Sequence, residues 1–426
     1  GLDGRGRWTV STEQLAGGGC RRSWLLAPRT GAEGRLAFVV RLLSPDPGCT
    51  PILDEYVPSN FVEMRKLMRH FRWWIVAAFC CAFAGCCLAQ TTTTENLGVH
   101  ENLGIREFRV HDPWILADRA TQTYYLYTAS GARGSGSHRS GVVTYKSKDL
   151  KTWSGPYVVF EVPDGSWADP SAGVWAPEVH FYKGKYYLFA TLNNYKQPIP
   201  AKPQTADARN QTHIEVTYGG AGQHLRGTQI FASDSPSGPF LPISDKPIPP
   251  MDTMSLDGTF YIENGTPYMV YAHEWIQLVD GNMEAIQMTP DLTSSVGQPF
   301  FLFKASDAPW LDERHDAVNT PQVYVTDGPE LYRTRKGKLL MLWSSYDKGS
   351  YVEALAHSTS GKLAGPWRQD GILVGDDSGH GMLFHAFDGR LMLVLHHPFD
   401  GRLSKAHLYE IEDTGDTIRV KKEVAY

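Results

Sequence analysis

Five polar residues that could carry acid–base chemistry recur along residues 112–397. Each stands in a turn beside Pro or Gly and is followed by a strand rich in Tyr, Leu and Val. Four are carboxylates and the fifth is a histidine: Asp112, Glu178, Asp257, Asp327 and His380. Several acids that converge on one concave site are suited to general acid–base catalysis. The chemistry therefore depends on a fold that brings five distant segments together.

The recurring unit itself predicts that fold. Copies spaced by about 50 to 80 residues, each with several short strands, are typical of β-propeller blades. Alternating strands punctuated by Ser-Gly-Pro and Asp-Gly indicate antiparallel sheets, with no sustained helical period. In a propeller the first strand of each blade lines the axis, so equivalent positions face one funnel. The sequence predicts an all-β fold with a single five-bladed β-propeller over residues 110–426.

Composition narrows the ligand class. The formal net charge is −5 over 426 residues, and the repeats contain no basic run, so nucleic acid is a poor candidate partner. Aromatic residues make up 12% of the chain and would suit a sugar, whose C–H faces pack on rings. All six cysteines precede the repeats, which therefore have no disulfide, thiolate metal site or cysteine nucleophile.

Residues 64–89 have the pattern of a secretory signal. Basic residues come first, and an uncharged stretch from Trp73 to Ala89 ends in small residues. This stretch is slightly short for a bilayer span of about 20 residues. Cleavage after Ala89 would release a secreted or periplasmic protein. Alternatively, residues 83–86 resemble a bacterial lipobox, and Cys86 would carry a lipid that anchors the protein to the outer membrane.

Residues 1–63 fit neither route, because a secretory signal normally starts a chain. We expect translation to begin at Met64 and residues 1–63 to be non-native or mispredicted sequence, with a genuine extension as the alternative. Residues 90–109 are expected to form a Thr-rich linker and lead-in to the first blade.

Five motifs, one in each blade, carry a family resemblance. In chain order they are His111-Asp112-Pro, Trp175-Ala-Pro-Glu, Ser255-Leu-Asp257-Gly-Thr-Phe, Thr326-Asp327-Gly-Pro and Gly379-His380-Gly-Met. Over about residues 105–426 the chain resembles glycoside hydrolase family 43, which has a five-bladed propeller and includes arabinanases, α-L-arabinofuranosidases and β-xylosidases. The resemblance implies an inverting glycosidase whose substrate is a plant polysaccharide or oligosaccharide containing arabinose or xylose.

The resemblance also implies roles for individual residues. Asp112 matches the general base, and Asp257 matches a third carboxylate that orients the acid and raises its pKa. Asp327 stands where the family usually has its general acid, in a Glu-Gly-Pro motif. His380 matches a histidine that helps to hold a metal ion, often calcium, through water. The resemblance implies no required cofactor, and the metal that His380 would help to hold is a structural calcium at the propeller axis.

The chemistry of inverting glycoside hydrolysis also calls for three carboxyl groups. Inversion needs a base and an acid on opposite faces of the sugar, with carboxyl groups ~6.5–9.5 Å apart. A nearby carboxylate keeps the acid protonated by like-charge repulsion. Asp327 is one methylene shorter than the usual Glu and reaches about 1.5 Å less far. Three outcomes follow: Asp327 is the acid on a closer substrate, Glu330 reaches in instead, or the acid is lost.

Aromatic and polar residues in the same motifs are candidates for sugar binding. They are Trp175, Glu178, Trp114 and Trp275, although Trp in a sheet protein is more often part of the core.

Two other functions compete with the glycosidase. A non-catalytic carbohydrate-binding propeller is motivated by Asp at position 327. A fructan-cleaving propeller of families 32 and 68 would show an Asn-Asp-Pro motif and a Glu-Cys motif. Here His111 precedes Asp112, and no cysteine follows residue 87, which argues against that class.

Overall fold

The computed structural model describes residues 98–130, 139–200, 222–311 and 323–425, together with four short strands further upstream. The chain divides into two compact units, Gly1–Thr93 and Thr94–Tyr426. The predicted signal at 64–89, with Cys86, lies outside the described residues, so both processing routes remain predictions. Among the described residues, no helix is long and apolar enough to cross a membrane.

The first unit contains one antiparallel sheet within residues 1–63. Its strands pair in chain order: β1 (Trp8–Ser11), β2 (Ser23–Thr30), β3 (Leu36–Leu43) and β4 (Glu55–Val57). Regular strands were not expected in this segment. Whether it belongs to the native protein stays a prediction.

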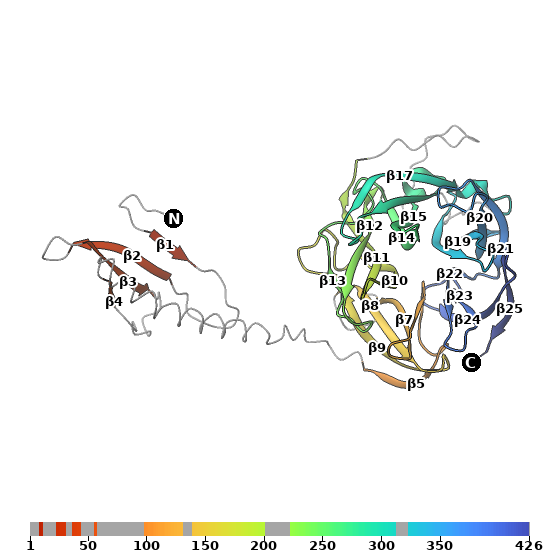
Figure 1. Cartoon of the computed structure of the whole chain (residues 1–426), viewed down its shortest axis with the longest axis horizontal. Helices are drawn as coiled ribbons and strands as arrows, with labels where there is room; N and C mark the ends of the chain where they lie inside the picture. The colour runs from red at the N-terminus through yellow and green to blue at the C-terminus, as the bar shows by residue number, and fades with distance from the viewer. Residues whose placement is uncertain are drawn as a thin grey trace. The chain divides into compact units, whose positions relative to one another are not determined.

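The second unit consists of five antiparallel sheets arranged around an axis (Figure 1), and the predicted all-β, five-bladed propeller is confirmed. Blade one contains β6 (Trp114–Asp118), β7 (Thr123–Ser130), β8 (Gly141–Ser147) and β9 (Thr152–Glu161), with β5 (His100–Gly104) added beside β9. Blade two contains β10 (Val174–Tyr182), β11 (Lys185–Pro198), β12 (His224–Ser233) and β13 (Leu241–Pro242). Blade three contains β14 (Ser255–Glu263), β15 (Thr266–His273), β16 (Asn282–Met288) and β17 (Ser295–Lys304).

The last two blades follow the same order. Blade four contains β18 (Asp327–Arg333), β19 (Leu339–Asp347), β20 (Ser350–Ser358) and β21 (Trp367–Val374). Blade five contains β22 (Gly379–His385), β23 (Leu391–His397), β24 (Lys405–Asp413) and β25 (Ile418–Val424). The helices described are short: α2 (Trp275–Leu278) and the 3₁₀ turn η1 (Ala305–Asp307).

The apolar runs of the sequence become strands that are buried on both faces. In β19, Leu339, Met341 and Trp343 join a cluster shared with blade three, while Leu340 and Leu342 join one shared with blade five. Successive side chains of a strand point to opposite faces, so one strand supplies two interfaces. Each fully buried Leu or Met contributes about 1.5–3 kcal/mol. Interblade packing of this kind fixes the inner strands around the axis.

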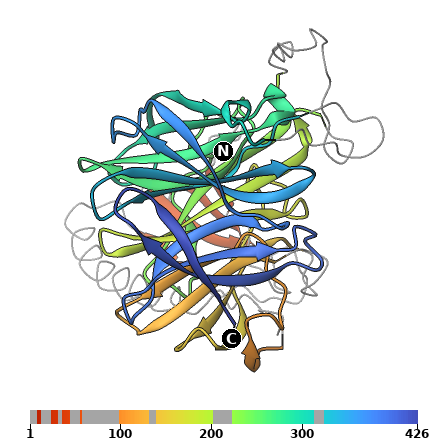
Figure 2. The same cartoon turned by 90° about the vertical axis from the view of Figure 1, so that its right-hand side faces the viewer.

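The ring closes between blade five and blade one, where β22 lies against β6. Among the described strands, each sheet is built from one continuous stretch of chain, so no strand is shared across this seam. Hydrogen bonds cross it instead: Val110 N donates to Ser404 O (3.1 Å), and Phe387 N donates to Tyr124 Oη (2.7 Å). The outer strands of blades four and five face the viewer in Figure 2.

Candidate active site

A β-bulge interrupts the inner strand of blades two to five at the same register. In each, two residues on the inner strand lie opposite one on its neighbour, and the irregularities lie between Trp175 and Glu178, Leu256 and Thr259, Asp327 and Glu330, and Gly379 and Met382. The first residue inside each bulge has a left-handed φ: Ala176 (41°), Asp257 (56°), Gly328 (53°) and His380 (53°). Asp112 (47°) occupies the matching point before β6. Such bulges redirect side chains and are common beside active sites.

The bulges correct one feature of the sequence prediction. Asp112, Asp257 and His380 are equivalent, because each occupies the left-handed position. Asp327 instead lies one residue before its bulge position, and Glu178 lies two residues after. The expectation that all five polar residues are equivalent is therefore wrong. The extra residue of the bulge shifts which side chain faces the axis.

A cavity of about 520 Å³ opens where the bulges meet. It brings together six of the eight residues predicted from sequence, which are Asp112, Asp257, Asp327, His380, Trp175 and Trp275. Among its other lining residues are His111, Glu274, Tyr351 and Phe399. Five carboxylates, two indole rings and two imidazoles thus surround one space of ligand size.

Glu178 and Trp114 do not line this cavity. Glu178 is buried with Oε2 2.8 Å from His180 Nε2, and Trp114 packs on the same imidazole while its Nε1 donates to Val179 O (2.9 Å). Both face the interior because they lie two residues past the bulge position. The structure therefore gives no support to the expected sugar contacts of these two residues.

Glu330 shares the register of Glu178. It is buried, and its Oε2 accepts a hydrogen bond from Leu383 N (2.7 Å). Burial raises the pKa of Glu330 well above its usual value. Glu330 does not line the cavity, so the reading in which it replaces Asp327 as the acid lacks structural support.

Histidines surround Asp112. Oδ1 lies 3.3 Å from His380 Nδ1, 3.3 Å from His396 Nδ1 and 3.6 Å from His111 Nε2. Burial acts to raise the pKa of Asp112, but His111, His380 and His396 outweigh it and hold that pKa well below its ordinary value. Burial also lowers the pKa of His396 to about 3 and lowers the pKa of His380. The ionised form of Asp112 is stabilised first by electrostatic attraction to His111 and His380 and then by a hydrogen bond with His396.

The other two carboxyls form a second electrostatic environment. Asp257 Oδ2 accepts a hydrogen bond from Gly328 N (3.0 Å), and Tyr351 Oη donates to Asp327 Oδ2 (3.2 Å). Burial raises the pKa of Asp257 well above its usual value, and the negative charges of Asp327 and Asp112 raise it further. One cavity thus combines an ionised carboxylate with a carboxyl that retains its proton.

The donor set does not match a calcium ion held directly by protein oxygens. Among the described residues, the three acidic, His or Cys ligand atoms that lie within 4.8 Å of one another belong to His111, Asp112 and His396. Two imidazoles and one carboxylate suit a transition metal, whereas calcium takes six to eight oxygens. The metal-holding role of His380 remains a prediction.

Sequence reasoning missed His396, Tyr351 and Glu274. His396 and Glu274 stand at or just beyond the ends of β23 and β15, where an apolar run gives way to polar residues. Because the second strand of each blade ends near the start of the first, those polar residues reach the same funnel. That change in polarity was a usable signal. Tyr351, near the start of β20, carried no comparable signal.

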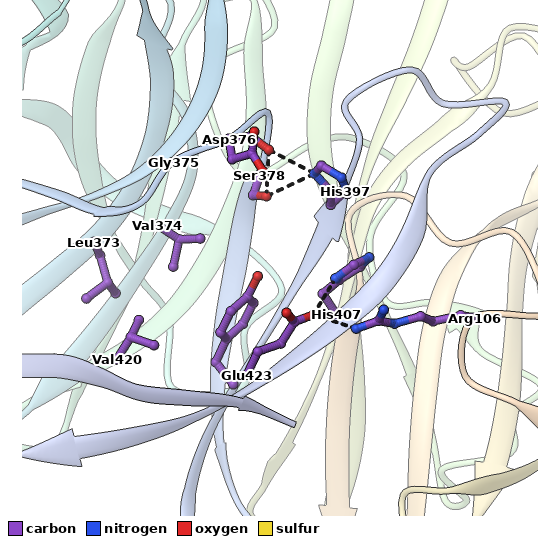
Figure 3. A pocket seen from close by; sticks show the side chains of 11 residues that line it. Arg106, Leu373, Val374, Gly375, Asp376, Ser378, His397, His407, Val420 and Glu423 are labelled. Carbon is purple, nitrogen blue, oxygen red and sulfur yellow. Dashed lines mark hydrogen bonds and ion pairs between the residues drawn. The ribbon is translucent and has the colours of Figure 1, made fainter. Parts of the chain in front are cut away.

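A second cavity, of about 480 Å³, lies between the outer strands of blades four and five (Figure 3). Its charged side chains are paired with one another: Glu423 accepts from the Arg106 guanidinium and from His407 Nδ1 (2.8 Å). His397 Nδ1 lies 2.8 Å from Asp376 O and 3.2 Å from Ser378 Oγ. This cavity lacks the crowded carboxylates of the first.

The sequence model of "Glycosyl hydrolases family 43" matches residues 104–412. The chain belongs to glycosyl hydrolase family 43. The resemblance carried by the five motifs is thereby confirmed, and so is the expectation of a glycoside hydrolase.

Known members of family 43 share the fold. An endo-arabinase from Bacteroides thetaiotaomicron is 35% identical with a TM-score of 0.61, and the match covers 74% of this chain and 98% of that one. An α-L-arabinofuranosidase from Lactobacillus brevis is 17% identical with a TM-score of 0.55, covering 76% and 99%. The extracellular endo-α-(1→5)-L-arabinanase 1 of Bacillus subtilis is 29% identical over 91 residues, which are 20% of this chain and 26% of that protein.

Proposed function

We propose that this family-43 protein is an inverting glycoside hydrolase acting on arabinose-containing plant polysaccharides, with xylose-containing polymers as the alternative substrate. One observation carries the proposal. The cavity holds Asp112 with its pKa well below the usual range, opposite in character to Asp257, whose pKa is well above it. A base and a retained proton in one cavity are what glycoside inversion requires. The 35% identity to an endo-arabinase favours arabinan as the substrate.

In the proposed reaction, the ionised carboxylate of Asp112 takes a proton from a water molecule. The water oxygen attacks the anomeric carbon from the face opposite the glycosidic bond, and that bond breaks. The histidines around Asp112 keep it ionised and oriented before the water binds.

Asp327 supplies the proton that the leaving oxygen accepts. Tyr351 holds the carboxyl of Asp327 by a hydrogen bond. Asp257 and Asp327 share one proton, because like-charge repulsion disfavours the state in which both carboxyls are ionised. The placement of Asp327 in the cavity, and of Glu330 outside it, favours Asp327 as the acid. The steps use the chain's own carboxyls, and we propose no cofactor for them.

We also propose that the segment at 64–89 directs export, so that the enzyme meets polymer outside the cytoplasm. Release after Ala89 and lipid attachment at Cys86 are the two routes. Mass spectrometry of the mature N-terminus from an exporting host would separate them, because a lipidated Cys86 adds a diacylglycerol mass.

A panel of substrates tests the function. Aryl arabinofuranosides, aryl xylosides, aryl galactosides and polymeric arabinan would be incubated with the protein, and the product anomer read by proton NMR. We expect arabinan and arabinofuranoside hydrolysis with inversion. Retention of configuration would overturn the mechanism, and hydrolysis of xylosides alone would move the substrate to xylan.

The shorter side chain of Asp327 motivates the second candidate, a carbohydrate-binding propeller without turnover. That candidate predicts oligosaccharide binding by wild-type protein that is inert on the whole panel, with turnover gained in Asp327→Glu.

A further inference from the structure

Glu274 is a buried carboxylate in the wall of the catalytic cavity. It follows β15 directly and precedes α2, and its backbone N donates to Met254 O (2.9 Å). The residue is 1% exposed, yet it lines the cavity beside Trp275. Oε1 is paired with the Arg226 guanidinium, whereas Oε2 has no hydrogen-bond partner among the described residues.

Arg226 holds the Glu274 carboxylate in place through the ion pair with Oε1. Arg226 is fully buried, and its Nε donates to Asn193 Oδ1 (2.6 Å). The guanidinium carbon lies 4.2 Å from the centre of the Trp175 ring, a cation–π contact. One cation therefore holds both Glu274 and an indole that lines the cavity. Gly173 leaves room for that indole, because a Cβ there would lie 3.2 Å from Trp175 Nε1.

A buried carboxylate oxygen without a partner is costly, because folding removes its hydrogen bonds to water. The cost is recovered when a ligand hydroxyl binds there. A cationic ligand is disfavoured, since Arg226 already balances the charge of Glu274. The two indole rings that line the same cavity suit the C–H faces of a sugar, and a single charged acceptor suits its hydroxyl.

We propose that Oε2 of Glu274 accepts a hydrogen bond from a hydroxyl of the bound sugar, with Trp175 and Trp275 bounding the same subsite. The inference rests on the proposed function, since it assigns a specificity contact within that cavity. Glu274 is a binding residue and not the proton donor, because its carboxylate is committed to Arg226. It recognises a hydroxyl pattern, and so selects one pentose over another.

The central experiment is a double-mutant cycle between protein and substrate. Wild type and Glu274→Gln would be assayed on an aryl arabinofuranoside and on its monodeoxy analogues. Hydrogen bonds to charged groups lead us to expect kcat/KM to fall by about 10- to 100-fold for the parent substrate. For the analogue that lacks the contacting hydroxyl, the two proteins should differ by less than about threefold. The same loss on every analogue would overturn the proposal.

Glu410→Gln is the matched control, because Glu410 is also a buried, ion-paired carboxylate but lies outside the cavity. It should leave kcat/KM unchanged. If Glu274→Gln fails to fold, Glu274→Asp keeps the charge for Arg226 and withdraws the carboxylate by one methylene. That variant should show the same substrate-dependent loss, and wild-type kinetics in it would overturn the proposal.

Calorimetry with arabinotetraose separates failure of this inference from failure of the proposed function. Hydrolysis by wild type, together with unchanged arabinotetraose binding in Glu274→Gln, would contradict the Glu274 contact alone. A wild-type protein that does not hydrolyse arabinotetraose, but binds it at least tenfold more tightly than Glu274→Gln does, would contradict the proposed hydrolase function and support the Glu274 contact. Neither hydrolysis nor binding by wild type would overturn both.

Discussion

The axial cavity and the outer cavity between blades four and five are nearly equal in size, about 520 and 480 Å³, and both contain carboxylates and histidines. They differ in how charge is balanced. In the outer cavity Glu423 is paired with Arg106 and His407, and the side chains of Glu423 and Arg106 are exposed to water. In the axial cavity Asp112, Asp257 and Asp327 crowd together beside His111 and His380.

The difference shows that the proposed chemistry depends on carboxylates whose charges are not fully balanced by neighbouring groups. Exposed ion pairs are worth about 1 kcal/mol or less. In the axial cavity, His111, His380 and His396 lower the pKa of Asp112, whereas burial and the charges of Asp327 and Asp112 raise the pKa of Asp257. Shape alone would not distinguish the two cavities.

The largest effect is expected from Asp112→Asn. It removes the proposed base while keeping the size of the side chain, so kcat should fall by about 10²–10⁴-fold with little change in unfolding midpoint. The matched change in the outer cavity is Glu423→Gln, which should leave kcat unchanged. Steady-state kinetics and thermal unfolding of both variants check this. An Asp112→Asn protein with more than about a tenth of wild-type turnover would remove Asp112 from the base role.

Asp327→Ala should give the next largest effect, and it should depend on the leaving group. Turnover of substrates with poor leaving groups should be lost, whereas dinitrophenyl sugars, which depart without protonation, should react nearly as in wild type. Asp327→Glu should keep or raise activity because it restores the reach of the longer side chain. Equal losses on good and poor leaving groups would show that Asp327 has a structural role instead.

Asp257→Asn should change the position of the pH–rate profile along the pH axis more than it changes the maximal rate. When one carboxyl of the Asp257–Asp327 pair is ionised, its negative charge makes the proton on the other harder to remove. This charge therefore raises the pKa of the alkaline limb of the profile. Removing that charge should lower the pKa of Asp327 and move the limb of kcat/KM to lower pH. Asp376→Asn, in the outer cavity, is the control and should leave the limb in place. An unmoved limb in Asp257→Asn would rule out the coupling.

Glu353→Gln should give the smallest effect, on stability. Burial raises the pKa of Glu353 to about 8, while hydrogen bonds from Gly381 N and Ser344 Oγ oppose this. The folded protein therefore keeps a proton that the unfolded chain releases above its ordinary pKa, so stability falls as pH rises from about 4.5 to 8. Glu353→Gln should flatten that decline in urea unfolding measured across this range. A parallel decline in the variant would show that another group causes it.

Much of the architecture could be predicted from sequence because it rests on local signals. Apolar runs such as Leu339–Trp343 mark strands buried on both faces, and turn doublets mark their ends. Ordering five such units is enough to predict the propeller. The motifs then place Asp112, Asp257, Asp327 and His380 in one cavity.

The misplaced residues share one physical cause, which is register. A bulge adds one residue to the inner strand, and the sequence does not show on which side of the turn doublet it falls. Glu178 therefore faces the interior although its motif resembles the others. Trp114 does the same in blade one, whereas Trp175 lies in the cavity. Glu274 was missed because its importance comes from Arg226, a residue 48 positions away in the chain.

The seam between blades one and five places the parts of one functional unit on separate ends of the chain. Asp112 enters from the blade-one side, two residues after Val110, whereas His380 and His396 belong to the last blade. During synthesis the carboxylate emerges together with His111 but long before His380 and His396. In a nascent or C-terminally clipped chain, Asp112 would have His111 beside it but neither His380 nor His396. Docking of the final blade then adds these two imidazoles to the carboxylate.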